Sequence, residues 1–298
     1  MSDNHNHHSF AGKNKKNLKI VFILTFCFMI VEAVGGYLTN SLALIADAAH
    51  MFTDTGALGL ALIAIWFAER PPTPDKTYGY YRAEILAALI NSLVLLLISF
   101  FILYEAWQRL NNPPEVLSKP MLLIASVGLV INLVGMKLLS EGSSQSLNMK
   151  GAYLEVFSDM LGSIGVIIAS LLIMFKGWEI ADPIVSIAMA VFILPRTWHL
   201  LKQVIHVLLE GTPSHIEIAE VEQELAKIEG VVAVHDTHIW TITSGIDAMT
   251  AHVEIEDFNA GDNILVEIKK VLVQKFNILH STIQLETEGC KECDLINF

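Results

Sequence analysis

Two pairs of ionisable residues with the same spacing stand inside apolar stretches of this sequence. His50 and Asp54 lie in "DAAHMFTD", and Glu155 and Asp159 lie in "YLEVFSDMLGS". Residues four apart occupy one face of a helix, one turn from each other. If the two helices pack face to face, one imidazole and three carboxylates converge, and Zn²⁺, Cd²⁺ and Co²⁺ all accept such ligands. The spacing therefore predicts a divalent metal site shared by two helices.

The placement of these groups in apolar surroundings also indicates a pathway. A charge at the centre of a bilayer costs about 3 to more than 10 kcal/mol, so ionisable residues there face a bundle interior or a wet cavity. One such residue alone, near a helix end, is more often an interfacial or hydrogen-bonded group, and we interpret Asp47 in this way. Gly56, Gly162 and Gly165 lie near the pairs, and small residues let two helix backbones approach closely. The repeated pair favours the metal site.

The segments that carry the pairs are predicted to be membrane-spanning helices. Of the 298 residues, 53% are hydrophobic and 17% are charged, and the mean hydropathy is +0.51. Apolar runs reach the roughly 20 residues that a spanning helix needs, and turn-forming sequences such as "ERPPTPDK" and "NNPPEVLSKP" separate them. We predict six spans, at Leu18–Tyr37, Ser41–Ala68, Ala83–Trp107, Met121–Leu139, Tyr153–Phe175 and Ala181–Leu201.

The basic residues predict the orientation of these spans. Before span one, between spans two and three, and between spans four and five lie Lys13, Lys15, Lys16, Lys19, Arg70, Lys76, Arg82 and Lys150. The opposite loops hold Arg109, Lys119 and Lys176. Because basic loops stay on the cytoplasmic side, we expect both termini in the cytoplasm. The formal net charge of −12 argues against a nucleic-acid partner.

The chain after residue 208 is predicted to be a separate domain. It is acidic, carries shorter apolar runs, and is predicted to form helix His215–Ile228, strands Val231–Thr243 and Ala248–Glu256, helix Asp262–Phe276 and strand Thr282–Thr287. The expected organisation is a His-containing disordered tail over residues 1–16, a six-helix transmembrane domain over 17–208, and a small α+β (αββαβ) cytoplasmic domain over 209–298. Three cysteines do not make a disulfide framework, so the two cysteines of "CKEC" are interpreted as a metal-binding pair or as surface residues without a role.

The sequence resembles the cation diffusion facilitator family, in particular its bacterial cobalt–zinc–cadmium resistance type, which is similar to the vertebrate zinc transporters. "SLALIADAAHMFTD", "YGYYRAEILAALIN", "GAYLEVFSDMLGS", "LLEGTP" and "VHDTHIW" carry the resemblance. It implies a homodimer in a lipid bilayer that exchanges cytoplasmic Zn²⁺ or related ions for protons. It also implies that His50, Asp54, Glu155 and Asp159 form the transport site. The zinc transporters have histidine where this chain has Glu155. A third carboxylate hardens the site and is expected to widen its ion range toward cobalt or cadmium.

The resemblance implies a second metal site in the cytoplasmic domain. His235, His252, His280 and Glu286 match metal-binding positions of the family, and Cys290 with Cys293 matches the C-x-x-C of the zinc-transporter branch. A single strand histidine is more often structural, and His238 is ambiguous. "HNHH" near the start is interpreted as a solvated tail, with a low-affinity metal scoop as the alternative.

These patterns predict a divalent metal exporter, above all for Zn²⁺ and also for Cd²⁺ and Co²⁺, that works as a metal/proton antiporter from the cytoplasm. Zn²⁺ is then the transported ion and a regulatory ion, and no cofactor serves catalysis. A bacterial inner membrane is the expected location. Two alternatives remain open. An intramembrane metalloenzyme would need a general base and commonly H-E-x-x-H, which the sequence lacks, whereas a membrane-anchored metal sensor would need no membrane pairs.

Overall fold

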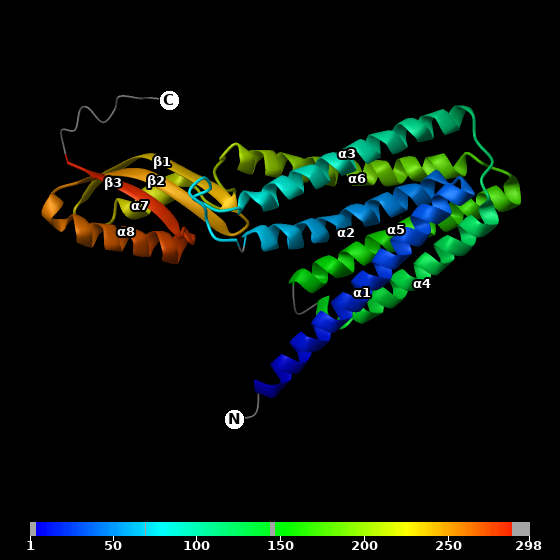
Figure 1. Cartoon of the computed structure of the whole chain (residues 1–298), viewed down its shortest axis with the longest axis horizontal. Coiled ribbons are helices and arrows are strands. Elements are labelled where there is room, and N and C mark those ends of the chain that lie inside the picture. The colour runs from blue at the N-terminus through cyan, green and yellow to red at the C-terminus, as the bar shows by residue number, and fades with distance from the viewer. Residues whose placement is uncertain (1–3, 69, 144–146, 288–298) are drawn as a thin grey trace. The chain divides into compact units, whose positions relative to one another are not determined.

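The computed structural model of the protein describes residues 4–68, 70–143 and 147–287. Within these ranges the side chains of residues 4–16, 53–54, 57–65, 67–68, 141–143 and 147–148 are outside the description. Six long helices come first in the chain, followed by a smaller set of helices and strands (Figure 1). The long helices are α1 (Asn4–Thr39), α2 (Leu42–Ala68), α3 (Arg82–Asn111), α4 (Ser118–Ser143), α5 (Leu147–Lys176) and α6 (Ala181–Leu208).

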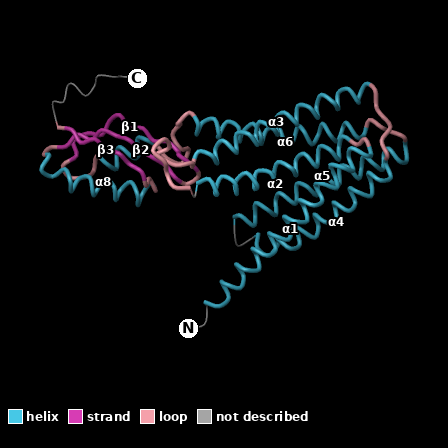
Figure 2. The backbone as a smooth tube through the Cα atoms, viewed as in Figure 1, coloured by secondary structure: helices cyan, strands magenta, loops and turns pink. Residues whose placement is uncertain are grey.

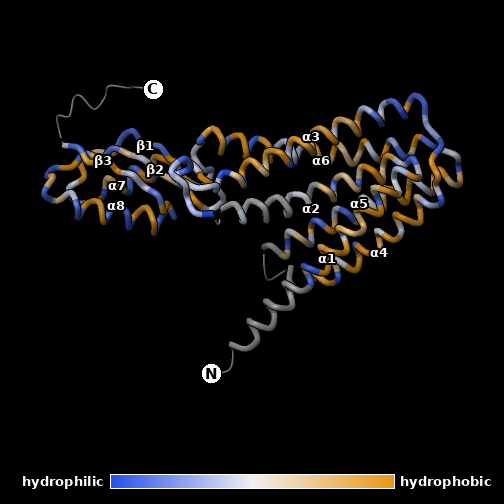
Figure 3. Tube along the Cα trace, viewed as in Figure 1, coloured by the Kyte–Doolittle hydropathy of each residue, from blue (hydrophilic) through white to orange (hydrophobic). Residues whose placement is uncertain are grey.

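Each long helix contains one of the six predicted spans, which confirms the predicted α-helical membrane fold. Five of them are long and apolar enough to cross a membrane, and in α2 the described apolar part is the shorter stretch Leu42–Phe52. Apolar residues dominate all along α3 to α6, and polar residues gather toward the helix ends (Figure 3). The helices also expose large apolar side chains, such as Leu97 and Phe192. Such surfaces suit lipid rather than water.

Helix α1 begins at Asn4, 14 residues before the first predicted span at Leu18. Extending a helix from an existing span avoids the cost of nucleation, and residues 4–16 contain no proline that would stop it.

Two compact units divide the chain: residues up to 61 with 90–201, and residues 62–89 with 202–298. In the first unit α4 packs along α5, and α1 packs on α4. Glycines permit two of the close approaches. A Cβ atom at Gly128 of α4 would lie 2.5 Å from the Phe28 ring of α1, and one at Gly162 of α5 would lie 2.7 Å from Asp47 Oδ1 of α2. The second contact confirms that small residues bring α5 close to α2.

The first turn of α2 is fastened to the start of α6 by Asp182. This carboxylate is fully buried. Its Oδ2 accepts a hydrogen bond from the Leu42 amide at 2.8 Å, and its Oδ1 accepts from the Ser41 hydroxyl at 2.6 Å and from the Ala43 amide at 3.2 Å. Arg109 Nη1 of α3 lies 3.8 Å from Oδ2. A carboxylate at this place satisfies amides that a helix start leaves open and complements the helix dipole.

The later part of the second unit is a small α+β domain, as predicted. It contains α7 (Ile218–Leu225), β1 (Val231–Thr243), β2 (Ile246–Ile255), a 3₁₀ turn (Phe258–Ala260), α8 (Gly261–Phe276) and β3 (His280–Glu286). The sheet order is β1-β2-β3, with β1 antiparallel and β3 parallel to β2 (Figure 2). Glu224 of α7 pairs with Lys227 and Lys275, and these lysines lower its pKa from 4.5 to about 2.

Strand alternation gives the sheet one buried face and one open face. On β2 the residues Met249, Ala251, Val253 and Ile255 are buried, and they share a core with Val221 and Leu225 of α7 and with Ile264, Ile268 and Leu272 of α8. Successive side chains of a strand point to opposite faces. The side chains between the core residues of β2, His252 among them, therefore project from the face that the helices do not cover.

Candidate metal centres

Two of the four predicted transport ligands meet between α2 and α5. His50 Nε2 lies 3.9 Å from Asp159 Oδ1, and the two residues are only 8% and 5% exposed. A cavity of about 260 Å³ borders His50, with walls from α2, α5 and α6 that include Gly162, Met189 and Phe192. Most of this wall is apolar, and such a setting strengthens the interaction of an ion with its few polar ligands.

The distance between His50 and Asp159 is close to that of two ligands on one ion. Zinc binds imidazole nitrogen at about 2.0–2.1 Å and carboxylate oxygen at about 2.0–2.2 Å, which places two tetrahedral ligands about 3.4 Å apart. In the described part of the chain, Asp159 Oδ1 has no hydrogen-bond partner. A small movement of either side chain would bring the two ligand atoms to the separation expected for two ligands of one zinc ion.

The other two predicted ligands are placed differently. Asp54 belongs to α2, but its side chain lies outside the described residues. Glu155 makes a two-point ion pair with Arg196 of α6, with Nη1–Oε1 at 2.9 Å and Nη2–Oε2 at 3.1 Å. No spacing or motif in the sequence indicated a role for Arg196. An arginine inside an apolar span such as "FILPRTW" is the signal that could have found it, because such residues need a partner.

Two buried carboxyl groups lie near this site. Glu32 of α1 and Asp47 of α2 are 0% and 1% exposed. In the described part of the chain, both Glu32 oxygens and Asp47 Oδ1 make no hydrogen bond. Buried acids without partners are costly inside a membrane span. The spacing along the chain, from which Asp47 was interpreted as structural, did not indicate Glu32.

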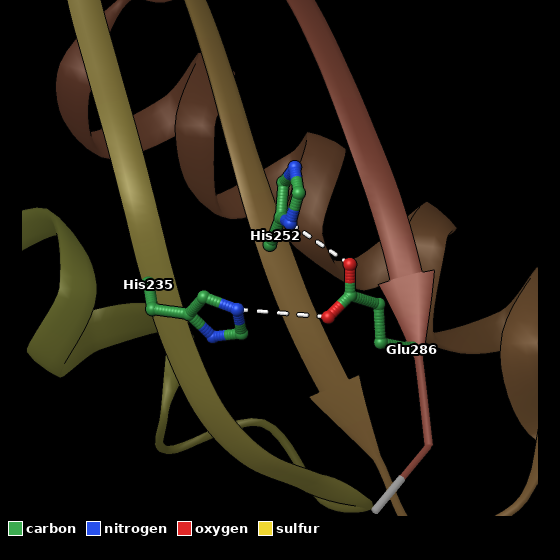
Figure 4. A group of neighbouring side chains, drawn as sticks. All are labelled: His235, His252 and Glu286. Atoms are coloured by element: carbon green, nitrogen blue, oxygen red, sulfur yellow. Dashed lines mark ion pairs between the residues drawn. The ribbon is translucent and has the colours of Figure 1, made fainter. Parts of the chain in front are cut away.

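In the tail domain, three predicted ligands form a group on the open face of the sheet. His235 of β1 stands opposite His252 of β2, and Glu286 lies at the end of β3 (Figure 4). His252 Nδ1 is 2.8 Å from Glu286 Oε1, and His235 Nε2 is 3.6 Å from Glu286 Oε2. One ligand atom from each residue lies within 4.8 Å of the others. Two imidazoles and a carboxylate, at these distances, suit Zn²⁺ or a related ion.

A β-bulge shapes the edge of this group. Between His235 and His238, three steps on β1 oppose two steps on β2, because His235 pairs with His252 and His238 pairs with Thr250. The extra residue brings two histidines of odd spacing to the same face. Asp236 in the bulge has a φ of 49°, a left-handed conformation that aspartate tolerates. Its carboxylate lies 3.0 Å from His238 Nε2 and 3.7 Å from His252 Nε2.

Among the described residues, the predicted tail ligand His280 is not in this group. His280 begins β3, opposite Ala248, whereas Glu286 ends the same strand opposite Glu254. The structure thus places His280 several residues along the strand from the three-residue group. Cys290 and Cys293 lie outside the described residues, as do the side chains of His5, His7 and His8.

Apolar helices that bury ionisable groups around a cavity, followed by a small domain with a surface histidine group, define a multi-pass membrane protein that handles metal ions. Comparison with known proteins gives the family. The cation efflux transmembrane domain matches residues 18–209, and the cation efflux protein cytoplasmic domain matches residues 213–288. The chain belongs to the cation efflux family. It is a transporter and not an enzyme, which sets aside the metalloenzyme alternative.

Several characterised relatives align over nearly the whole chain. The cation efflux system protein CzcD of Alcaligenes sp. strain CT14 is 49% identical over 288 residues, 96% of this chain and 91% of that protein. A cadmium, cobalt and zinc/H⁺-K⁺ antiporter of Bacillus subtilis strain 168 is 47% identical over 294 residues, 97% of this chain and 93% of that protein. The zinc transporter ZitB of Escherichia coli K12 is 41% identical over 295 residues, 97% and 94% of the two chains.

Proposed function

We propose that this protein exports Zn²⁺, and also Cd²⁺ and Co²⁺, from the cytoplasm in exchange for protons. The observation that carries the proposal is the buried meeting of His50 and Asp159 beside a cavity. The relatives support it, since one is named a cadmium, cobalt and zinc/H⁺-K⁺ antiporter and another a zinc transporter. The proposed site consists of His50, Asp54, Glu155 and Asp159.

The chemistry of the ligands explains why metal movement is coupled to protons. A histidine nitrogen or a carboxylate binds a metal only after losing its proton, so ions and protons compete for the same groups. Facing the cytoplasm, the deprotonated site takes up the ion. Facing the other side, the site releases the ion as His50 and at least one carboxylate become protonated. The protonated site then returns. Buried ionisable groups are costly, and this exchange is the function that requires them.

The tail group is proposed to regulate transport. His235, His252 and Glu286 would hold the ion, because their ligand atoms already lie close together in a single protomer. The direct contact between His252 Nδ1 and Glu286 Oε1 at 2.8 Å would give way to two bonds to the ion. Binding at the interface of a homodimer would draw the two tail domains together and bias the helices toward the competent state. The tail and both termini are proposed to face the cytoplasm of a bacterial cell, with the helices in its inner membrane.

The test is metal flux in proteoliposomes, followed with an ion-sensitive dye inside and a pH dye alongside. The parent should move Zn²⁺ inward against protons, and His50→Ala or Asp54→Ala should abolish both signals. The variant Asp54→Asn keeps the side-chain size, and His50→Asn keeps a polar side chain of smaller size. Both should fail in the same way, which separates ligand loss from misfolding. Transport that survived either alanine variant would contradict the proposed site. A nucleotide-hydrolysis assay on the same vesicles should remain silent.

A further inference from the structure

The contact between Arg196 and Glu155 uses both oxygens of a carboxylate that the transport site also needs. The guanidinium of Arg196 donates from Nη1 to Oε1 at 2.9 Å and from Nη2 to Oε2 at 3.1 Å. Such a parallel two-bond pair is the strongest form of the arginine–carboxylate contact. In a carboxylate held in this way, the best-directed lone pair of each oxygen accepts a hydrogen bond from the guanidinium. While Arg196 remains in place, these lone pairs of Glu155 are not available to a metal ion.

Arg196 stands beside the transport cavity. Phe192, four residues earlier on α6, lines that cavity, and residues four apart share a helix face. The Arg196 side chain is 62% exposed, against 28% for Glu155, so the long arginine stem has room to swing away when the carboxylate is required elsewhere.

We propose that Arg196 is a positioning residue that acts as a tethered counter-ion: it neutralises Glu155 while the site holds no metal, and it is displaced when the metal binds. This inference rests on the proposed function, because it requires Glu155 to be a transport ligand. An emptied site with three acids would suffer mutual repulsion. Protons bound to the site relieve part of this repulsion, and the permanently charged guanidinium of Arg196 relieves a further part. Glu155 can therefore stay ionised while the emptied site turns back toward the cytoplasm. The ion must displace this internal competitor, which lowers affinity and assists release.

The two roles that Arg196 could have predict opposite changes in affinity. If the arginine only holds α6 against α5, its removal loosens the site and weakens metal binding. If it competes with the metal, its removal strengthens binding and slows release. The KM for Zn²⁺ and the maximal flux rate therefore separate a competitor from a merely structural contact, because competition predicts that both quantities fall together.

The experiment measures Zn²⁺ flux in proteoliposomes for Arg196→Gln, Arg196→Lys, Glu155→Gln and the double variant Arg196→Gln/Glu155→Gln. For Arg196→Gln the KM should fall roughly tenfold, the factor expected for losing one charge-assisted competing contact, and the maximal rate should fall with it. In the Glu155→Gln background the added Arg196→Gln change should leave the KM unaltered, since the competition is already gone. An unchanged or raised KM in Arg196→Gln overturns the proposal.

Arg196→Lys keeps the inference testable if Arg196→Gln does not fold. Lysine retains the charge but offers a point contact in place of a planar fork, so the KM should fall by a smaller factor. A KM equal to or above that of the parent overturns the proposal here as well. Failure of the proposed function would be distinct: flux would then persist in His50→Ala or Asp54→Ala, whatever the Arg196 variants do.

Discussion

Glu155 has two uses in one side chain, as a predicted ligand and as the partner of Arg196. As the third carboxylate of the proposed site, it favours harder metal ions than a histidine at the same position would. The sequence alone could predict the ligand role, since an i, i+4 pair is visible along one helix. The contact with Arg196 could not be predicted in the same way, because it joins α5 to α6 across 41 positions of the chain. Packing decides it.

Replacing Glu155 by histidine should narrow the ion preference. The variant would have a set of two imidazoles and two carboxylates, which favours Zn²⁺ over the harder alternatives, and a histidine cannot accept the two-point contact of Arg196. We expect the ratio of Co²⁺ to Zn²⁺ flux to fall by roughly an order of magnitude, which corresponds to about 1.4 kcal/mol. Metal-by-metal flux in proteoliposomes measures it.

The matched control for that variant is Glu155→Gln, which keeps the shape of the side chain but lacks the charge. It should weaken transport of all three ions by similar factors. A Co²⁺ to Zn²⁺ ratio that is the same in Glu155→His and in the parent would show that this position does not set preference.

Among the helices, the start of α2 depends on a residue far along the chain. Asp182 of α6 accepts hydrogen bonds from the Ser41 hydroxyl and from the Leu42 and Ala43 amides, whereas the local cap is the Ser41 hydroxyl, which accepts from the Leu44 amide. "DP" at 182–183 was an obvious helix-start signal for α6, yet nothing local indicates that the same carboxylate caps α2. In the tail, the bounds of β1 were predicted residue for residue. Its bulge was not predicted, because the bulge depends on the pairing register with β2.

Asp182→Asn should lower the melting temperature of the detergent-solubilised protein without changing its helix content. The amide keeps the size of the carboxylate but loses its charge, and half of its hydrogen-bonding atoms become donors that face the amide donors of α2. A lost helix cap lowers the free energy of unfolding by about 1 kcal/mol. The loss of the negative charge beside Arg109 lowers it further. Circular dichroism during heating is the measurement.

Ser41→Ala is the control for the carboxylate, because it removes the hydroxyl that donates to Asp182 and accepts from the Leu44 amide but leaves the charge and the Leu42 and Ala43 hydrogen bonds in place. Its melting temperature should lie between those of the parent and Asp182→Asn. Identical melting curves for the parent and Asp182→Asn would mean that the carboxylate contributes nothing to holding α2.

For the whole molecule, the membrane ligands and the tail ligands belong to different compact units, since His50 falls in the first and His252 in the second. Composition and hydropathy indicate a change near residue 208, from apolar spans to short amphipathic elements. The second compact unit also contains residues 62–89, which the sequence pattern did not separate from the spans. The partner subunit of a dimer leaves no comparable pattern in one sequence.

If the tail group is regulatory, the triple variant His235→Ala/His252→Ala/Glu286→Ala should keep the basal exchange but lose its acceleration by cytoplasmic-side Zn²⁺. The two imidazoles and the carboxylate are the donors that would hold the ion, so their removal leaves no closed site in one protomer. Inward flux at graded Zn²⁺ concentrations outside the vesicles, which is the cytoplasmic side of the inward-transporting molecules, measures it.

His280→Ala is the matched control for the tail, since this histidine stands apart on the same strand. Acceleration in this variant should equal that of the parent when the site closes within one protomer. If the triple variant responded to Zn²⁺ as the parent does, the regulatory role would be wrong.

The glycine at position 162 has a consequence for the spacing of the two helices that carry His50 and Asp159. Its missing side chain lets the α5 backbone lie against the Asp47 carboxylate of α2. A Cβ atom there would lie 2.7 Å from Asp47 Oδ1, so any other residue would force the helices apart or displace Asp47. Either movement alters the surroundings of His50 and Asp159 while leaving both residues in place.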